Sequence, residues 1–121
     1  MMSLTAEPLE LELPDVYDDG FLRVEHENYY VTYNGKNVKL PRAEFLILSR
    51  LVRTPDRFVS SSELWEEAWG TRKNFNSVSL HVYIYRLRRK FEAFGMKIET
   101  MVNVGYRFVP AQTGANTINR T

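Results

Sequence analysis

The chain has 121 residues, of which 44% are hydrophobic and 26% charged, as expected for one globular domain with a single modest core. It contains no cysteine, which excludes disulfides, thiolate metal sites and cysteine nucleophiles. No apolar run approaches the roughly 20 residues of a membrane span, and the first residues lack the features of a secretory signal. We therefore expect a cytoplasmic protein with no membrane partner.

The net charge of +1 conceals an uneven distribution. Residues 1–40 hold eight acidic and three basic side chains, whereas residues 41–121 hold thirteen basic and seven acidic ones. Within residues 71–97, seven basic side chains accompany a single acid, Glu92. Because phosphate binding depends on local charge, this basic segment predicts contact with nucleic acid, and the acidic first third does not.

The first third of the chain predicts a small antiparallel meander. Residues 1–19 are expected to be weakly structured, with an alternating segment at 9–13 as a candidate edge strand. Residues 21–24 and 29–33 are rich in β-branched and aromatic residues, which favours two strands. The Asn-Gly pair at 34–35 is a strong type I′ turn signal, and residues 36–40 supply the returning strand.

Two helices are predicted next. The first covers residues 41–53, starts at a proline, and shows one apolar face made by Phe45, Leu48, Leu51 and Val52. The second opens on a capping box, in which Ser60 is followed three residues later by Glu63. It runs to Trp69 and stops at Gly70, after which a polar, basic connector leads to residue 76.

The third helix carries the most information. It is predicted over about residues 77–94, with Asn76 or Ser77 as its cap and Gly95 as its left-handed stop. At 3.6 residues per turn, its apolar side chains form one buried stripe: Leu80, Ile84, Leu87 and Phe91. A second face gathers cations, hydroxyls and a small apolar group: Ser79, Val82, Tyr83, Arg86, Arg89 and Lys90. That mixture suits the major groove of DNA, and the alternative is a solvated basic helix face.

A hairpin follows, with strands at 97–100 and 105–109, and residues 110–121 are expected to be a disordered polar tail. Strands, three helices and a closing hairpin together predict an α+β winged helix-turn-helix, in which the hairpin forms a wing beside the third helix. The domain is expected to span residues 20–109.

The sequence resembles the C-terminal effector domains of OmpR/PhoB-type transcriptional regulators. The resemblance covers about residues 20–109 and rests on five blocks in the right order and spacing. These are Asn34-Gly35 with Val38-Lys39-Leu40, then 44–48, then 60–64 leading to Ala68-Trp69-Gly70, then 82–90, and finally Gly105-Tyr106-Arg107-Phe108.

The resemblance implies that the third helix enters the major groove, that the wing reaches an adjacent minor groove, and that the loop between the second and third helices contacts RNA polymerase. Matching positions for base contact are Ser79, Val82 and Arg86, and for phosphate contact Trp69, Tyr83, Tyr85, Arg88 and Tyr106. We add Ser61 at the start of the second helix, Arg89 and Lys90 on the basic face, and Thr100 on the wing. The polymerase-contact loop comprises Thr71, Arg72, Lys73 and Asn74. For Trp69 and Tyr106, partial core packing is the alternative.

The resemblance also implies a site architecture. Two copies are expected to bind double-stranded promoter DNA head-to-tail on direct repeats about one helical turn, roughly 10–11 base pairs, apart. Free in solution, the domain is expected to be a monomer. The 121 residues leave no room for a receiver domain of the usual family layout. The chain is compatible with a piece of a two-domain regulator, a free-standing effector domain, or the head of a membrane-anchored regulator.

Three positions depart from the family pattern. Val78 stands where an arginine usually precedes the small hydroxyl residue of the third helix, and Val102 stands where the wing tip usually carries a basic residue. Ser61 replaces a phosphate-binding basic residue at the start of the second helix. Since each phosphate contact adds about one counterion to the salt dependence, we expect binding to be weaker and less salt-sensitive than is typical of the family.

Catalysis has little support in the sequence. His26, expected in a turn between strands, and His81, expected at the surface, fit neither a metal-ligand nor a triad pattern. The three acids Glu63, Glu66 and Glu67 fit a solvated helix face better than paired catalytic carboxylates. We therefore expect no enzyme, metal or cofactor. A winged helix acting as a protein-interaction adaptor, with little affinity for DNA, is the alternative function.

Overall fold

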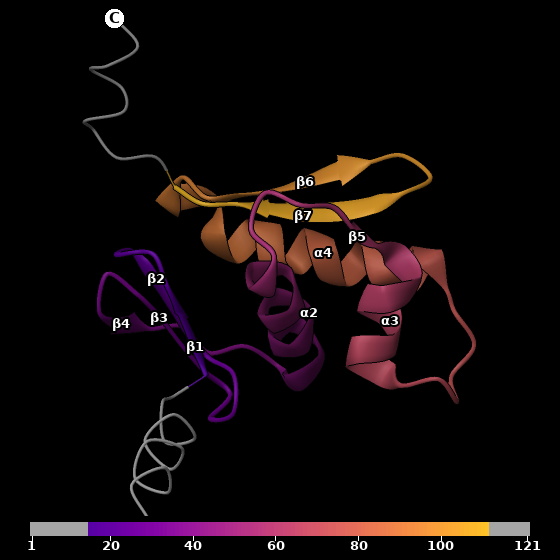
Figure 1. Cartoon of the computed structure of the whole chain (residues 1–121), viewed down its shortest axis with the longest axis horizontal. Coiled ribbons are helices and arrows are strands. Elements are labelled where there is room, and N and C mark those ends of the chain that lie inside the picture. The colour runs from indigo at the N-terminus through magenta and orange to yellow at the C-terminus, as the bar shows by residue number, and fades with distance from the viewer. Residues whose placement is uncertain (1–14, 112–121) are drawn as a thin grey trace, which may run out of the picture.

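The computed structural model describes residues 15–111, which form two small antiparallel sheets and three helices (Figure 1). The four-stranded N-terminal sheet and helix α3 lie at opposite ends of the long axis, and helices α2 and α4 lie between them (Figure 1). The candidate strand at 9–13 and most of the C-terminal tail lie outside the described residues. The predicted α+β winged-helix architecture is confirmed.

The N-terminal sheet has the order β1-β2-β3-β4, with strands β1 (Val16–Asp18), β2 (Leu22–Glu25), β3 (Tyr30–Tyr33) and β4 (Lys36–Asn37). The predicted turn between β3 and β4 is confirmed, since Asn34 and Gly35 have φ angles of 51° and 81°. Strand β4 is shorter than the predicted 36–40 because the chain leaves the sheet to enter α2.

Strand β1 was not predicted as a strand, and it lies inside the segment that we expected to be weakly structured. Its contacts include one with a residue far away in the sequence and several within the neighbouring turn. The ring of Tyr17 meets that of Phe108 edge-on at 5.6 Å, and its hydroxyl donates to the carboxylate of Asp19 at 2.7 Å. Asp19 also accepts hydrogen bonds from the backbone N–H groups of Phe21 and Leu22. The acidic turn at Asp19 thus stabilises β1, although the acidic residues in this segment made a strand look unfavourable from the sequence.

The helices follow the predicted caps closely. They are α2 (Arg42–Arg53), α3 (Ser61–Trp69) and α4 (Ser77–Phe91). The hydroxyl of Ser60 accepts from the backbone N–H of Glu63 at 3.1 Å, as the capping box predicts. The side-chain oxygen of Asn76 accepts from the N–H of Ser79 at 3.0 Å and caps α4. The predicted helix over 77–94 ends its α-helical part at Phe91 and continues as the 3₁₀ turn η1 (Glu92–Phe94) before Gly95.

The second sheet has the order β5-β7-β6, with strands β5 (Val59–Ser60), β6 (Lys97–Met101) and β7 (Gly105–Val109). The β6–β7 hairpin is the predicted wing. Strand β5 was not predicted, because two residues give no periodic signal. Gly105 makes this pairing possible, since a Cβ atom there would lie 1.9 Å from the carbonyl oxygen of Val59.

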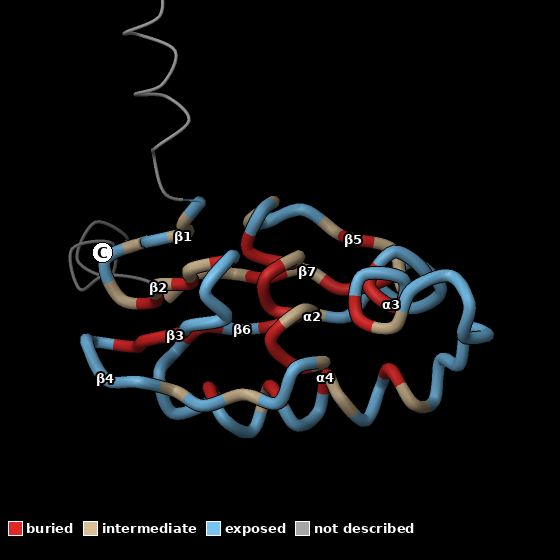
Figure 2. The backbone as a smooth tube through the Cα atoms, turned by 90° about the horizontal axis from the view of Figure 1, so that it is seen from below, coloured by how far each residue is buried: buried red, intermediate tan, exposed pale blue. Residues whose placement is uncertain are grey.

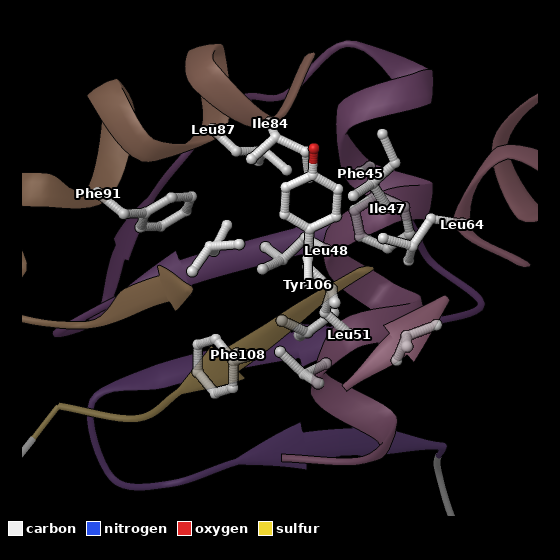
Figure 3. Close-up of a cluster of buried hydrophobic side chains, with 14 of the residues drawn as sticks. Phe45, Ile47, Leu48, Leu51, Leu64, Ile84, Leu87, Phe91, Tyr106 and Phe108 are labelled. Carbon is white, nitrogen blue, oxygen red and sulfur yellow. The ribbon is translucent and has the colours of Figure 1, made fainter. Parts of the chain in front are cut away.

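The core lies between α2, α4 and the β6–β7 hairpin. Helix α4 buries one side and exposes the other (Figure 2), and the predicted stripe of Leu80, Ile84, Leu87 and Phe91 is fully buried. Figure 3 shows Ile84 and Leu87 of α4 close to Leu48 of α2, with Phe108 of β7 below them. This packing fixes which face of α4 is left for a partner.

Candidate nucleic-acid interface

The outer face of α4 is chemically divided along its length. Its N-terminal half exposes Val78 and Val82, which are 73% and 41% accessible to solvent. Its C-terminal half exposes Tyr85, Arg86 and Arg89. All of these side chains lie on the side of the helix away from the buried stripe, as the periodicity predicts. A partner approaching α4 therefore meets methyl groups at one end and guanidinium groups at the other.

A groove of about 730 Å³ lies between the start of α4, the start of α3 and the wing. The serines at the start of α3 form one wall and the wing residues from Thr100 to Tyr106 form another. On α4, the groove is lined by Ser77, Val78, His81 and Val82. The structure thus brings Ser61, Val82, Thr100 and Tyr106, predicted from separate parts of the sequence, to one concave surface.

Tyr106 packs in the core and also lines the groove. Its side chain is 6% exposed, and its hydroxyl lies 3.1 Å from Nδ1 of His81 on α4. Burial raises the pKa of the Tyr106 phenol above its usual value, and the nearby Arg88 guanidinium opposes this shift. In Figure 3 the Tyr106 oxygen points towards α4 while its ring lies among the core side chains. The sequence placed His81 at the surface, and the structure adds that it lines the groove.

Arg88 joins α4 to the wing. Its Nε donates to the backbone carbonyl of Ile98 at 2.8 Å, and its terminal nitrogen donates to the hydroxyl of Thr100 at 2.6 Å. Both Arg88 and Thr100 were predicted to contact DNA, and they are already hydrogen-bonded to each other. This pair positions the wing against α4, and phosphate contact by either side chain remains a prediction.

Lys90 is paired with a carboxylate. Its Nζ lies 2.6 Å from Oε1 of Glu44 on α2, and the Glu44 side chain is 2% exposed. The sequence placed Lys90 on the DNA face with Arg86 and Arg89. Within residues 15–111, those two arginines have no carboxylate partner, so their charges remain available to a polyanion.

An aromatic cluster connects α3 to α4. The ring of Trp69 lies 4.3 Å from that of Trp65 and 4.9 Å from that of Tyr83, and the guanidinium of Arg86 lies 5.1 Å from the Tyr83 ring centre. Trp69 and Tyr83 are half-buried, so the predicted packing role of Trp69 is present. Their phosphate contacts remain predictions.

Trp65 of α3 supports the loop between α3 and α4. The indole N–H of Trp65 donates to the backbone carbonyl of Lys73 at 2.9 Å, and the Trp65 ring meets Phe75 edge-on at 5.8 Å. Trp65 was not among the predicted site residues, although its indole supports the loop. The side chains of the predicted polymerase-contact residues are all exposed: Thr71, Arg72, Lys73 and Asn74.

The backbone N–H of Ser61 donates to the carbonyl of Val104 at 3.2 Å, which attaches the start of α3 to the wing.

His26 lies just after β2, as expected, but it is buried and its Nδ1 is hydrogen-bonded to the hydroxyl of Ser49 on α2. Residues 15–111 contain no group of three or more metal-ligating side chains, and none of the helices in this range could cross a membrane.

The chain is similar to known regulators over most of the described domain. The family model "Transcriptional regulatory protein, C terminal" matches residues 35–108, more than half of the chain. The response regulator MprA of Mycobacterium sp. (strain KMS) is 40% identical over 78 residues, which cover 63% of this chain and 34% of MprA. The sensory transduction protein RegX3 of Mycobacterium tuberculosis (strain ATCC 25618 / H37Rv) is 33% identical over 78 residues, covering 64% and 34%. The chain therefore spans about a third of the length of the curated relatives it matches.

Solved structures give the same assignment. The RstA DNA-binding domain of Klebsiella pneumoniae, crystallised in complex with the RstA box, superposes with a TM-score of 0.68 at 28% identity, covering 79% of this chain and 98% of that one. The response regulator DrrB of Thermotoga maritima, an OmpR/PhoB homolog, gives 0.69 at 28% identity, covering 90% and 51%. With its fold, its groove and its match over residues 35–108, this chain belongs to the family of C-terminal winged-helix domains of OmpR/PhoB-type transcriptional regulatory proteins.

Proposed function

We propose that this domain recognises double-stranded promoter DNA, with α4 in the major groove and the β6–β7 wing beside the adjacent minor groove. The observation that carries the proposal is the outer face of α4, where Arg86 and Arg89 have no carboxylate partner within the described residues. A buried stripe on the opposite side presents this face outward, and the β6–β7 wing lies beside α4 (Figure 1). The RstA domain, crystallised with the RstA box, supports the same use of the fold.

Within this arrangement, the side chains divide by role. The guanidinium of Arg86 lies over the Tyr83 ring. This contact orients the guanidinium for a bidentate contact with guanine. Ser79 and Val82 face neighbouring bases. Trp69, Tyr83 and Tyr85 contact phosphates, which position the helix without reading sequence.

The wing positions the domain on the DNA and reads little of the DNA sequence. Its tip carries Val102, which is 76% exposed and has neither a charge nor a hydrogen-bond donor for a minor groove. Thr100, Tyr106 and backbone N–H groups provide the polar contacts on this side. The adaptor alternative predicts apolar or mixed-sign groups in place of Arg86, Arg89 and Lys90, whereas all three side chains are basic.

We further propose that two copies bind direct repeats head-to-tail about one helical turn apart, that the free domain is monomeric, and that the exposed loop at 71–74 contacts RNA polymerase. A DNA-binding regulator of this type acts in the cytoplasm. Sedimentation with and without a two-repeat duplex tests the assembly. A tight dimer without DNA would contradict it.

Selection from a random duplex pool tests the function itself. The full chain is expected to enrich a repeated motif that contains guanine. Arg86→Ala is expected to relax the preference at one position by about 1–3 kcal/mol, because it removes one bidentate base contact. If Arg86→Ala weakened binding to all sequences equally, Arg86 would be a phosphate ligand. If no sequence were enriched, the domain would not be a sequence-specific DNA reader.

A further inference from the structure

We propose that the N-terminal half of α4 reads the 5-methyl groups of thymine through Val78 and Val82. The inference rests on the proposed function and adds a specificity to it. Val82 is one of the positions already assigned to base contact, whereas Val78 stands where the family resemblance led us to expect an arginine.

The two valines form one short apolar ridge. They are four residues apart, which places them about 40° apart around the helix axis and one turn apart along it. Val78 is 73% exposed and Val82 is 41% exposed, although both lie on a helix whose other side is fully buried. Neither belongs to the core of the described domain.

Exposed valines taken singly need no explanation, but these two line a groove whose wing side carries further apolar side chains. Both line the 730 Å³ groove, and the opposite wall carries Met101, Val102 and Val104 from the wing, each at least 45% exposed. A base edge that reaches the start of α4 would therefore remove the methyl groups of both Val78 and Val82 from water.

The chemistry of this half of α4 selects the base. Residues 77–85 contain no Arg, Lys, Asn, Gln, Asp or Glu, so they cannot make the bidentate contacts that identify guanine or adenine. The Asn76 amide oxygen is occupied as the helix cap. In the major groove, the 5-methyl of thymine is the apolar group that a base pair presents, and helices of this class contact bases with their N-terminal residues. Thymine is the base that this ridge can recognise.

The positions of the valines and of Arg86 along α4 also predict the spacing between the thymines and the guanine in the DNA site. Arg86 follows Val82 by four residues and Val78 by eight, which is about 12 Å at 1.5 Å per residue. At 3.4 Å per base-pair step, the thymines are expected within about three to four steps of the guanine that Arg86 reads. Each half-site should thus be thymine-rich at one end and contain guanine at the other.

Deoxyuridine substitution tests the proposal at the level of one methyl group. Uracil keeps the pairing and the O4 acceptor of thymine and lacks only the methyl. A motif is first selected with the full chain, and each of its thymines is then replaced singly by deoxyuridine in synthetic duplexes. The unaltered protein is expected to lose about fourfold in affinity at one or two positions within the predicted spacing, as burial of one methyl implies. Thymines outside the footprint should show no change.

Variants identify the reading residues. Val78→Ala and Val82→Ala should each bind the thymine duplex more weakly and become insensitive to deoxyuridine at one position. Val102→Ala removes the same groups from a wing valine that is 76% exposed, close to the 73% of Val78, and it is the control that should keep the sensitivity of the unaltered protein. Circular dichroism confirms that the variants are folded.

The outcomes separate the two proposals. If a motif is enriched but it has no thymine within the spacing, or deoxyuridine has no effect, or both alanine variants keep the effect, the methyl-reading inference is wrong and the DNA-binding proposal stands. If no motif is enriched, both proposals fail, and the ridge would instead suit a protein partner.

Discussion

Lys90 provides a test that separates structure from DNA contact. Its ammonium lies 2.6 Å from a Glu44 carboxylate whose side chain is 2% exposed, whereas the Lys90 side chain itself is 37% exposed. Replacing Lys90 by methionine would keep most of the packing of the stem and would leave the buried Glu44 charge without its partner. Breaking a fully buried pair in this way costs about 3–5 kcal/mol.

Because Lys90 reaches solvent, the cost here should be smaller, about 2–3 kcal/mol in the free energy of unfolding. For a domain of this size, that loss corresponds to a decrease in Tm on the order of 10–20 °C. The double variant Glu44→Leu/Lys90→Met should recover most of the loss, since it removes the unpaired charge as well. Urea denaturation of the three proteins measures these differences.

DNA titrations at several salt concentrations complete the test. Lys90→Met should leave the salt dependence nearly unchanged at temperatures where it is folded. The matched control is Arg89→Met, one residue earlier, which has no ion-pair partner among residues 15–111. It should keep the stability and reduce the salt slope by about one unit. If Lys90→Met instead kept its urea midpoint and lost a unit of salt slope, Lys90 would be a phosphate ligand and the structural assignment would be wrong.

Three further predictions concern other parts of the fold. Gly105→Ala should destabilise the domain by about 3 kcal/mol in urea denaturation, because its Cβ would lie 1.9 Å from the carbonyl oxygen of Val59; an unchanged midpoint would contradict the β5–β7 pairing. Burial, assisted by a nearby positive charge, lowers the pKa of His26 below its ordinary 6.5, so the folded state binds fewer protons than the unfolded chain. Stability should therefore be full above about pH 6.5 and fall as the pH drops through that value, and His26→Asn should flatten this slope in denaturation curves between pH 5 and 7. Val102→Arg should tighten DNA binding, steepen the salt dependence by about one unit and favour A/T-rich flanks, whereas an unchanged slope and flank preference would mean that the wing does not reach the groove.

The features that could be predicted from the sequence are those with local signals. The stripe from Leu80 to Phe91 repeats with the helical period, and the Ser60–Glu63 capping box lies within one turn. The Asn34-Gly35 turn is equally local, since both residues adopt the positive φ angles that the turn requires. In each case the determinant and the structure lie within a few residues of each other, so tertiary context does not change the outcome.

The features that could not be predicted depend on partners far away in sequence. Strand β5 exists because Val59 pairs with Tyr106, and two residues carry no period of their own. The burial of Glu44 and its pairing with Lys90 need α2 and α4 to be packed together. On a helical wheel Lys90 therefore looks like a member of the DNA face. The candidate site was predicted as a set of residues, and the concave surface that several of them share was not.

The Arg88 bridge between α4 and β6 has a mechanical consequence for the complex. The Arg88 guanidinium donates to both the Ile98 carbonyl and the Thr100 hydroxyl, and the backbone N–H of Ser61 on α3 donates to the Val104 carbonyl, so the wing is hydrogen-bonded to α4 and to α3. The separation between the groove-entering helix and the wing is then fixed before DNA arrives. A duplex whose grooves do not match that separation has to bend or change its groove width. Base pairs that the protein never touches would then influence affinity through their stiffness.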